Sequence, residues 1–248
     1  VIGPHYDHHG RGGSGSLAQR SGEVHHGADD NASGTAGMLE LARMFTAQRP
    51  RPKRTIVFIG FGGEEEGLLG SNYYVNHPIT PLTNTVAMIN MDMIGRMKDR
   101  KLVIGGVGTA KEWRDLIAKG TADSTRQFSL TLNEDGFGPS DHSSFYGKQV
   151  PVLFFWTGTH NDYHKPSDTF EKINYADQAR VVDLVGFIVR EVDGTDKRLT
   201  YTLAKTEATP RTGGFRVYLG TIPNYADSND GLLIDGIRDD SPAAKAGI

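Results

Sequence analysis

The sequence predicts an α/β fold in which a mostly parallel sheet is covered by helices on both faces. Residues 55–61 are almost continuously apolar and rich in β-branched and aromatic side chains, which is typical of a strand buried on both faces. Two further apolar runs, residues 85–91 and 150–156, have the same character. Segments with apolar residues at helical spacing separate the runs, as expected when helices cover such a sheet.

The N-terminal part of the sequence predicts a strand, a loop and a helix, in that order. Residues 1–2 begin a strand that leads into a histidine-rich segment at residues 5–9. Residues 10–27 are rich in glycine and serine and lack a hydrophobic period, so we expect a surface loop. An amphipathic helix follows, with Ser33 as its predicted N-cap. Its apolar face is formed by Met38, Leu41, Ala42 and Phe45.

Predicted helices and strands also follow one another in the later part of the chain. Residues 68–75 resume at helical spacing directly after the acidic turn that ends the 55–61 run. Residues 101–104 form a short predicted strand, and residues 128–132 alternate as an edge strand would. Between them, the apolar residues of a predicted helix are Trp113, Leu116 and Ile117. A helix over residues 175–192 closes this part, and its apolar residues are Ala179, Val182, Val185 and Ile188.

Composition excludes several classes of function. The chain has 248 residues, 37% of them hydrophobic, and a net charge of −3, which is ordinary for a soluble globular protein. The densest basic run, residues 49–54, is too short for a nucleic-acid track, so we expect no nucleic-acid partner. No apolar stretch approaches the roughly 20 residues of a membrane span. Cysteine is absent, so any metal must be held by His, Asp and Glu.

Potential metal ligands follow the apolar runs directly, or lie in a loop that leads into a helix. They are His5, Asp30, Glu64, Glu65, Asp92 and His164. Each has an ordinary explanation alone, such as a surface histidine or an acid at a helix start. The carboxyl ends of parallel strands converge on one crevice, however, so these side chains are expected to meet there. Nitrogen and oxygen donors without a thiol indicate a divalent metal.

The charge count favours two metal ions. Two Zn²⁺ ions carry four positive charges, which Asp30, Glu65, Asp92 and a bridging hydroxide would balance, with two neutral imidazoles completing the shells. Such pairs, about 3.5–4 Å apart, polarise a carbonyl and activate the water between them. Glu64 is left outside the shells, where a general base is needed to move the proton of the water to the leaving amine.

Five motifs in order carry a resemblance to a known family. They are GPHYD at residues 3–7, GADDNASG at 27–34, GEEEGLLGS at 63–71, NMDMIG at 90–95, and YH followed by Asp168 at 163–168. The sequence resembles the co-catalytic di-zinc aminopeptidase family, in particular bacterial leucyl-aminopeptidase-like enzymes. Relatives include plasma glutamate carboxypeptidase, glutaminyl cyclase and the transferrin receptor. The resemblance covers roughly residues 1–192 and implies the three-layer zinc-exopeptidase fold with a mixed, mostly parallel sheet.

The resemblance implies a metal-binding role for five residues. Asp30 would bridge two zinc ions. His5 and Asp92 would bind one ion, and Glu65 and His164 would bind the other. The family also leads us to expect a cis peptide bond after Asp30.

The resemblance also implies catalytic and supporting roles. Glu64 would be the general base, and Tyr163 would hydrogen-bond the oxyanion that forms at the scissile carbonyl. Asp7 would be the carboxylate that orients the first histidine ligand, and Asp168 would do the same for the last one. The segment Ser140-Asp141-His142 is similar to a family segment that lines the substrate pocket.

The sequence departs from the family pattern in its additional histidines. Those in the first loop either rim the pocket or lie in solvent, and we favour solvent for His8, His9, His25 and His26. His77 precedes a proline and is interpreted as a helix-end residue. His160 is a near neighbour of the last ligand without matching it, and Glu66 is expected to be structural.

The chain is expected to contain two domains. Residues 1–196 form a zinc metallopeptidase catalytic domain, residues 197–211 a polar linker, and residues 212–248 resemble the first half of a bacterial PDZ domain. The segments that carry the second resemblance are 215–220, 231–237 and 241–247. A complete PDZ domain binds peptide ends by strand addition, so a peptide or protein tail is an expected partner. We expect both domains to be truncated, one at its N-terminus and the other at its C-terminus.

The favoured function is a metallo-exopeptidase that removes N-terminal residues from peptides with a free amine. A carboxypeptidase or dipeptidase of the same fold would need a cation for the terminal carboxylate, and Arg96 is the candidate nearest a ligand motif. A one-metal glutaminyl cyclase fits less well, because the ligand set includes His5. A non-catalytic peptide-binding protein should have lost ligands or the base. A secreted or periplasmic location is expected.

Overall fold

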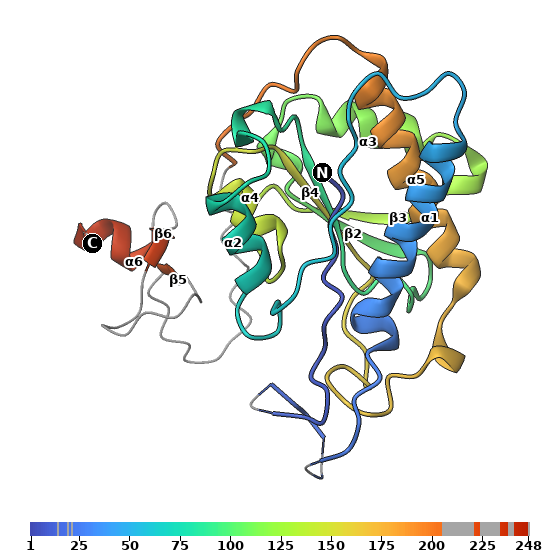
Figure 1. The fold of residues 1–248 in the computed structure, drawn as a ribbon, viewed down its shortest axis with the longest axis vertical. Helices are drawn as coiled ribbons and strands as arrows, with labels where there is room; N and C mark the ends of the chain where they lie inside the picture. Colours follow the sequence, from blue (N-terminus) through green and yellow to red (C-terminus); the bar gives the residue numbers. More distant parts are fainter. Residues whose placement is uncertain are drawn as a thin grey trace.

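A four-stranded mixed sheet forms the centre of the fold (Figure 1), in the order β1-β4-β2-β3. The computed structural model describes residues 1–13, 15–18, 20, 22–204, 221–223, 234–237 and 241–247. The four strands are β1 (Met88–Met91), β2 (Lys101–Gly105), β3 (Ser129–Leu132) and β4 (Val152–Trp156). β1 pairs with β4 and β2 with β3 in parallel, whereas β2 and β4 are antiparallel. The predicted mixed sheet is therefore confirmed, and β3 lies at its edge as predicted.

Two extended segments continue the parallel side of the sheet beyond β1. Ile2 bridges both Ile89 and Phe58, and His5 bridges Phe61. The prediction that residues 55–61 are buried on both faces is wrong, because most of them are only partly buried. Within the described part of the chain, this segment pairs with residues 1–6 on one side only, so its other edge lacks a strand neighbour.

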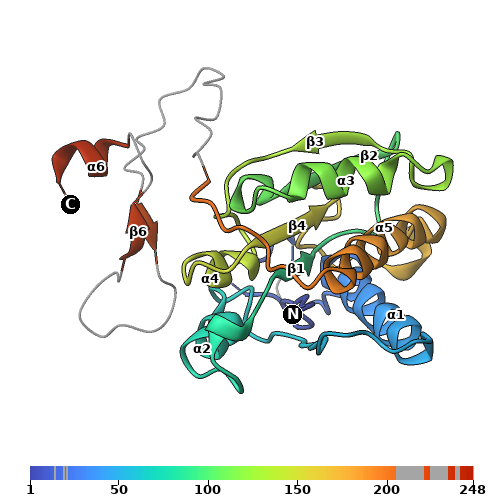
Figure 2. The ribbon, with the colours of Figure 1, turned by 90° about the horizontal axis from the view of Figure 1, so that it is seen from above.

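Helices cover both faces of the sheet (Figure 2). On one face lie α1 (Gly34–Ala47), α3 (Trp113–Thr121) and α5 (Tyr175–Gly194), with α5 packed against the other two. On the other face α2 (Leu69–Asn76) packs against α4 (His142–Tyr146). Short helical turns are η1 (Ala28–Ser33), η2 (Leu82–Asn84), η3 (Val107–Thr109), η4 (Ser124–Arg126) and η5 (Phe170–Lys172).

Each face of the sheet has its own hydrophobic core. Fully buried side chains under α1, α3 and α5 include Leu41, Ile104, Trp113, Phe155 and Leu184. The smaller core under α2 and α4 includes Phe61, Val75, Phe145 and Val152. One local helix prediction is wrong, because Ala179 is exposed on α5. Ser33 occupies the N-cap position of α1 as predicted, but its hydroxyl makes no capping hydrogen bond. The turn η1 runs directly into α1, so Ser33 is already helical and its hydroxyl donates to the Asp29 carbonyl at 2.7 Å.

The described C-terminal residues contain a strand pair and a short helix. β5 (Thr221–Pro223) is antiparallel to β6 (Ile234–Ile237), and α6 spans Pro242–Ala246. This helix is capped at its start, because the Ser241 hydroxyl accepts the Ala244 N–H at 3.1 Å. Residues 215–220 and 231–233, which carry part of the PDZ resemblance, lie outside the described residues, and the PDZ domain stays a prediction.

The first residues of the predicted linker pack against the sheet-containing part of the chain. Tyr201 bridges Ala110, and the Ala204 N–H donates to the Tyr146 hydroxyl at 3.0 Å. The rest of that linker, residues 205–211, is outside the described residues. In the described part of the chain, every helix is too short or too polar to cross a membrane.

Candidate metal centre

The predicted ligands meet at the carboxyl edge of the parallel strands. Asp92 follows β1 directly, His5 lies at the end of the first extended segment, and His164 lies in the loop after β4. Glu64 and Glu65 follow the bridge that Phe61 makes. Because these segments run in the same direction, their ends bring residues that are distant in sequence to one place, as the sequence predicted.

Two overlapping groups of ligand atoms share Asp30. His5, Asp30 and Asp92 form one group and Asp30, Glu65 and His164 the other, with all ligand atoms of a group within 4.8 Å of one another. In the first group, His5 Nε2 lies 3.4 Å from Asp30 Oδ1 and 3.4 Å from Asp92 Oδ1. In the second, His164 Nε2 lies 3.2 Å from Asp30 Oδ2 and 3.3 Å from Glu65 Oε2.

The spacing of these atoms fits metal coordination. Ligand atoms about 2.0–2.2 Å from a tetrahedral zinc ion are separated from one another by about 3.3–3.6 Å. The nitrogen–oxygen distances of 3.2–3.4 Å in both groups agree with that separation. His5 Nε2 and Asp92 Oδ1 are also buried without a hydrogen-bond partner among the described residues. Buried polar atoms are rarely left unpaired, so a cation between them accounts for their arrangement.

The pKa values of His164 and Asp30 show how strongly the side chains of the second group interact. Burial by itself lowers the pKa of His164, but hydrogen bonds with Asp30 and Glu65 outweigh burial and raise that pKa to about 10. Burial raises the pKa of Asp30, yet the contacts with His164 and His5 lower it below its usual range. The Asp30 carboxylate is therefore ionised, which is the protonation state that a metal ligand requires.

Glu64 differs from its neighbour Glu65. Its Oε2 lies 4.0 Å from His5 Nε2, which is longer than the edge of a zinc tetrahedron. Burial raises the pKa of Glu64 well above its usual range, and the nearby charge of Asp92 adds to that effect. A raised pKa makes a carboxylate a stronger proton acceptor, which suits a general base.

Asp168 supports the Asp30 turn and not His164, so the predicted role of Asp168 is wrong. Its Oδ2 accepts the backbone N–H groups of Asp29 at 2.8 Å and Asp30 at 3.1 Å. The Nδ1 of His164 lies instead 2.9 Å from the carbonyl oxygen of Gly15. The loop after β4 returns beneath residues 28–30, and sequence spacing carries no signal of that contact.

The Asp30 turn is fixed against the end of β1. The peptide bond between Asp30 and Asn31 is cis, as the resemblance implied. Asn31 Nδ2 donates to the Met91 carbonyl at 2.9 Å, and its Oδ1 accepts the Gly34 N–H at 2.9 Å. A Cβ atom on Gly34 would overlap the Met91 carbonyl oxygen, so glycine permits this close approach.

Asp7 contacts His5 in a different way from the one predicted. His5 Nδ1 lies 3.1 Å from the Asp7 backbone carbonyl, whereas the Asp7 carboxylate is 3.8 Å away. The carboxylate accepts the backbone N–H of Glu64 at 3.3 Å instead. Because residue 7 follows residue 5 so closely, its carbonyl is the nearer acceptor.

Tyr163 lies against the second group. Its ring stacks on that of His164 with 3.7 Å between the centroids. Burial raises the pKa of Tyr163 above its usual range, and the charges of Asp30 and Glu65 raise it further. The phenol therefore keeps its proton and can donate a hydrogen bond.

The prediction that the first-loop histidines lie in solvent is wrong for three of the four. His8 and His9 have side chains that are 8% and 3% exposed and both approach Glu65, and His25 is buried as well. His26 is exposed as predicted, and His77 ends α2 as predicted. The loop has no hydrophobic period, so only the two adjacent histidines just after a ligand motif offered a signal.

The remaining sequence candidates are also buried. Ser140, Asp141 and His142 have almost no exposed surface, and Asn90 Nδ2 donates to the Ser140 hydroxyl at 2.7 Å. The ring of His142 stacks on Phe154 with 4.4 Å between centroids. These residues lie beneath the centre, and their contact with a substrate stays a prediction. His160 Nε2 lies 3.2 Å from Asp29 Oδ2, outside both ligand groups.

A sequence comparison decides the family. The profile of peptidase family M28 matches residues 1–189. The chain belongs to peptidase family M28. Aminopeptidase YwaD of Bacillus subtilis is 33% identical over 181 residues, which are 69% of this chain and 39% of that protein. The predicted family resemblance is thus confirmed.

Solved structures of aminopeptidases share the fold. The zinc aminopeptidase BSAP from Bacillus subtilis superposes with a TM-score of 0.63 and 28% identity, over 80% of this chain and 46% of that one. The Legionella pneumophila LapA aminopeptidase gives a TM-score of 0.65 and 25% identity, over 79% and 51%. This M28 chain spans about half the length of the solved structures and less of the Bacillus protein.

Proposed function

We propose that the protein is a zinc-dependent aminopeptidase that hydrolyses N-terminal residues from peptides and uses two zinc ions per chain. The observation that carries this proposal is the pair of ligand groups that share Asp30, each with nitrogen–oxygen spacings of 3.2–3.4 Å. Membership of family M28 and the names of the aminopeptidase relatives support the same activity.

In this proposal the chain divides metal binding and proton transfer between neighbouring residues. His5 and Asp92 would hold one ion, Glu65 and His164 would hold the other, and Asp30 would contribute to both positions. Bound zinc supplies a Lewis acid for the scissile carbonyl and lowers the pKa of a water molecule. Residues that are not ligands transfer the proton, stabilise the developing oxyanion and hold the ligand turns in place.

Glu64 accepts the proton of the attacking water and passes it to the leaving amine. Its burial and its raised pKa support that role. Tyr163, which remains protonated, donates a hydrogen bond to the scissile carbonyl oxygen as that oxygen gains negative charge. Asp7 and Asp168 hold the backbone of Glu64 and Asp30 in place.

The charges around the centre favour substrates with a free amine. A carboxypeptidase would need a free cation for the terminal carboxylate, but Arg96 contacts Asp162 at 3.1 Å and Asp168 at 3.7 Å. Its side chain is only 18% exposed. The Glu64 carboxyl group beside the ligand groups and the outer oxygen of the ligand Asp92, by contrast, are hydrogen-bond acceptors for an α-ammonium group.

A substrate panel combined with metal analysis tests the proposal. We expect aminoacyl-nitroanilides with free amines to be hydrolysed, and acetylation of the amine to abolish hydrolysis. Elemental analysis should find at least two zinc ions per folded chain. Equal turnover of acetylated substrates, or release of residues from the carboxyl end, would overturn the aminopeptidase assignment. Finding at most one bound ion would overturn the two-metal arrangement.

The domain organisation is part of the proposal. We infer a catalytic domain over residues 1–196, extended by the contacts of residues 199–204, and a partial PDZ domain over residues 212–248. The complete PDZ domain of a longer protein would bind a peptide or protein tail. A secreted or periplasmic location belongs to the same proposal, and fractionation of cells that produce the natural protein would test it.

A further inference from the structure

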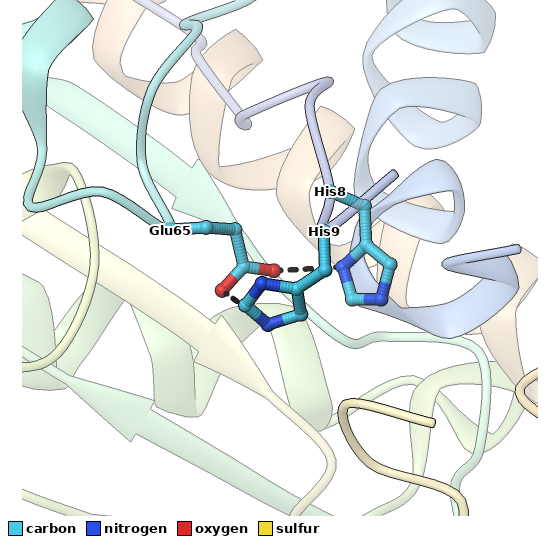
Figure 3. A group of neighbouring side chains, drawn as sticks. All are labelled: His8, His9 and Glu65. Atoms are coloured by element: carbon cyan, nitrogen blue, oxygen red, sulfur yellow. Dashed lines mark hydrogen bonds and ion pairs between the residues drawn. The ribbon is translucent and has the colours of Figure 1, made fainter. Parts of the chain in front are cut away.

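A group of three side chains lies beside the proposed zinc pair. His8, His9 and Glu65 come from two separate loops and converge, as Figure 3 shows, with their ligand atoms within 4.8 Å of one another. His8 Nδ1 lies 2.7 Å from Glu65 Oε1, and His9 Nε2 lies 3.3 Å from Glu65 Oε2. The three side chains are only 8%, 3% and 7% exposed.

Ring nitrogens of three histidines lie close to the carboxylate of Glu65. Its Oε2 lies 3.3 Å from His164 Nε2 and also 3.3 Å from His9 Nε2. The Nε2 atoms of both His8 and His9 are buried and make no hydrogen bond within the described part of the chain. Most buried polar atoms in proteins are paired, so the unpaired Nε2 of His9 beside Glu65 indicates that something else contacts it.

We infer that His8, His9 and Glu65 form an auxiliary site for a third divalent ion of the zinc class. Two imidazoles and one carboxylate are a donor set that zinc accepts. Imidazole nitrogen also suits copper and nickel, whereas magnesium and calcium prefer oxygen donors, so the last two are excluded. The 3.3 Å from His9 Nε2 to Glu65 Oε2 lies within the 3.2–3.4 Å range of nitrogen–oxygen spacings in the two proposed zinc positions.

The neighbouring histidine of the same loop does not belong to this site. His25 lies close to both rings, with centroids 6.2 Å from His8 and 6.0 Å from His9. Both of its nitrogens are already engaged, one 2.8 Å from the Ser16 hydroxyl and the other 3.0 Å from the Glu23 carbonyl. His25 therefore packs behind the two ligand rings, and the site needs only His8, His9 and Glu65.

Zinc stoichiometry in a set of variants tests the inference. The full chain is stripped of metal, dialysed against rising concentrations of zinc chloride, and analysed for bound zinc. We expect three ions per chain for the wild type, two for the His8→Asn/His9→Asn variant, two for His164→Asn, and one for the combined variant. The additive loss in the combined variant is the decisive result, because it requires two separate ions.

Two outcomes would overturn the inference. The first is equal zinc binding by the wild type and the His8→Asn/His9→Asn variant. The second is equal binding by the combined variant and His164→Asn, since the two histidines would then only support Glu65 in the proposed pair. His26→Asn, an exposed histidine of the same loop, is the matched control and should bind as many ions as the wild type.

Cobalt(II) binding by the unsubstituted chain tests the inference even if a variant fails to fold. A third equivalent of cobalt(II) should add its own visible absorption, and a spectrum that stops changing at two equivalents would contradict the third site. The inference does not depend on the proposed activity. The loss of an ion in His164→Asn tests the proposed pair, whereas the loss in His8→Asn/His9→Asn tests the auxiliary site.

Discussion

The carboxylate of Asp168 accepts the backbone N–H of Asp30 at 3.1 Å, although 138 positions separate the two residues. The same oxygen accepts the N–H of Asp29, so one buried side chain fixes the turn that presents Asp30 to both ligand groups. Asp168 is not itself a proposed ligand. Asp168 would therefore affect metal binding only by holding Asp30 in place.

Asp168→Asn should weaken zinc binding while leaving every proposed ligand in place. Loss of such a supporting contact typically costs about 10–100-fold in metal affinity. Competition with a chromogenic chelator measures the affinity. Asp162→Asn is the control, because that carboxylate also contacts Arg96 but makes no hydrogen bond to the Asp30 turn among the described residues. Equal affinities of the two variants would contradict the proposed support of Asp30.

The adjacent glutamates should respond differently to the same substitution. Glu64→Gln is expected to retain zinc and lower kcat by about 10²–10⁴-fold, because a general base is lost. Glu65→Gln is expected to lose zinc, because its carboxylate belongs to the second ligand group. Elemental analysis and steady-state kinetics on both variants separate these effects. The reverse pattern, with zinc lost from the Glu64 variant, would exchange the two assignments.

Gly34→Ala should destabilise the fold, since the new Cβ atom would overlap the Met91 carbonyl oxygen. Overpacking of this kind typically lowers the free energy of unfolding by about 1–3 kcal/mol. Urea denaturation followed by circular dichroism measures the change. Gly194→Ala is the matched control, because no atom lies within 4 Å of a Cβ there and the backbone does not require glycine. Equal stability of both variants would show that the helix start can move away from β1.

Stability should decrease in acid because of His142. Burial lowers the pKa of His142 from 6.5 to about 3, so below pH 6.5 the unfolded chain binds a proton that the folded chain does not. The free energy of unfolding should then fall, as pH falls from 6.5 towards 3, by about 1.4 kcal/mol per pH unit from this group. Urea denaturation at several pH values should show a shallower dependence for His142→Gln than for the wild type. His26→Gln should keep the wild-type slope, and identical slopes in all three proteins would contradict the prediction.

Much of the fold follows from local sequence patterns. The runs that became β1 and β4 are mostly apolar because both faces of those strands are buried. The helices α1 and α5 show helical spacing because one face of each is buried. The meeting of His5, Asp92 and Glu65 was also predictable, because parallel strand ends share one edge of a sheet.

The features that could not be predicted from the sequence depend on contacts between segments that are distant along the chain. The exposure of residues 55–61 depends on how many neighbours that segment has, and no local pattern reports that number. Likewise, the contacts of His8 and His9 with Glu65 depend on the path of a loop without a hydrophobic period. Asp168 was linked to the wrong partner because it is close to His164 in sequence but reaches Asp30 in space.

The spread of the ligand groups along the chain has a consequence for folding. The ligands begin at His5 and end at His164, and each comes from a different segment. A cation bound there would act as a cross-link that closes loops of very different lengths at once, and its binding free energy would become folding free energy. Removing the ion would release all of these loops together, so resistance to proteolysis should be lost cooperatively across the whole proposed catalytic domain.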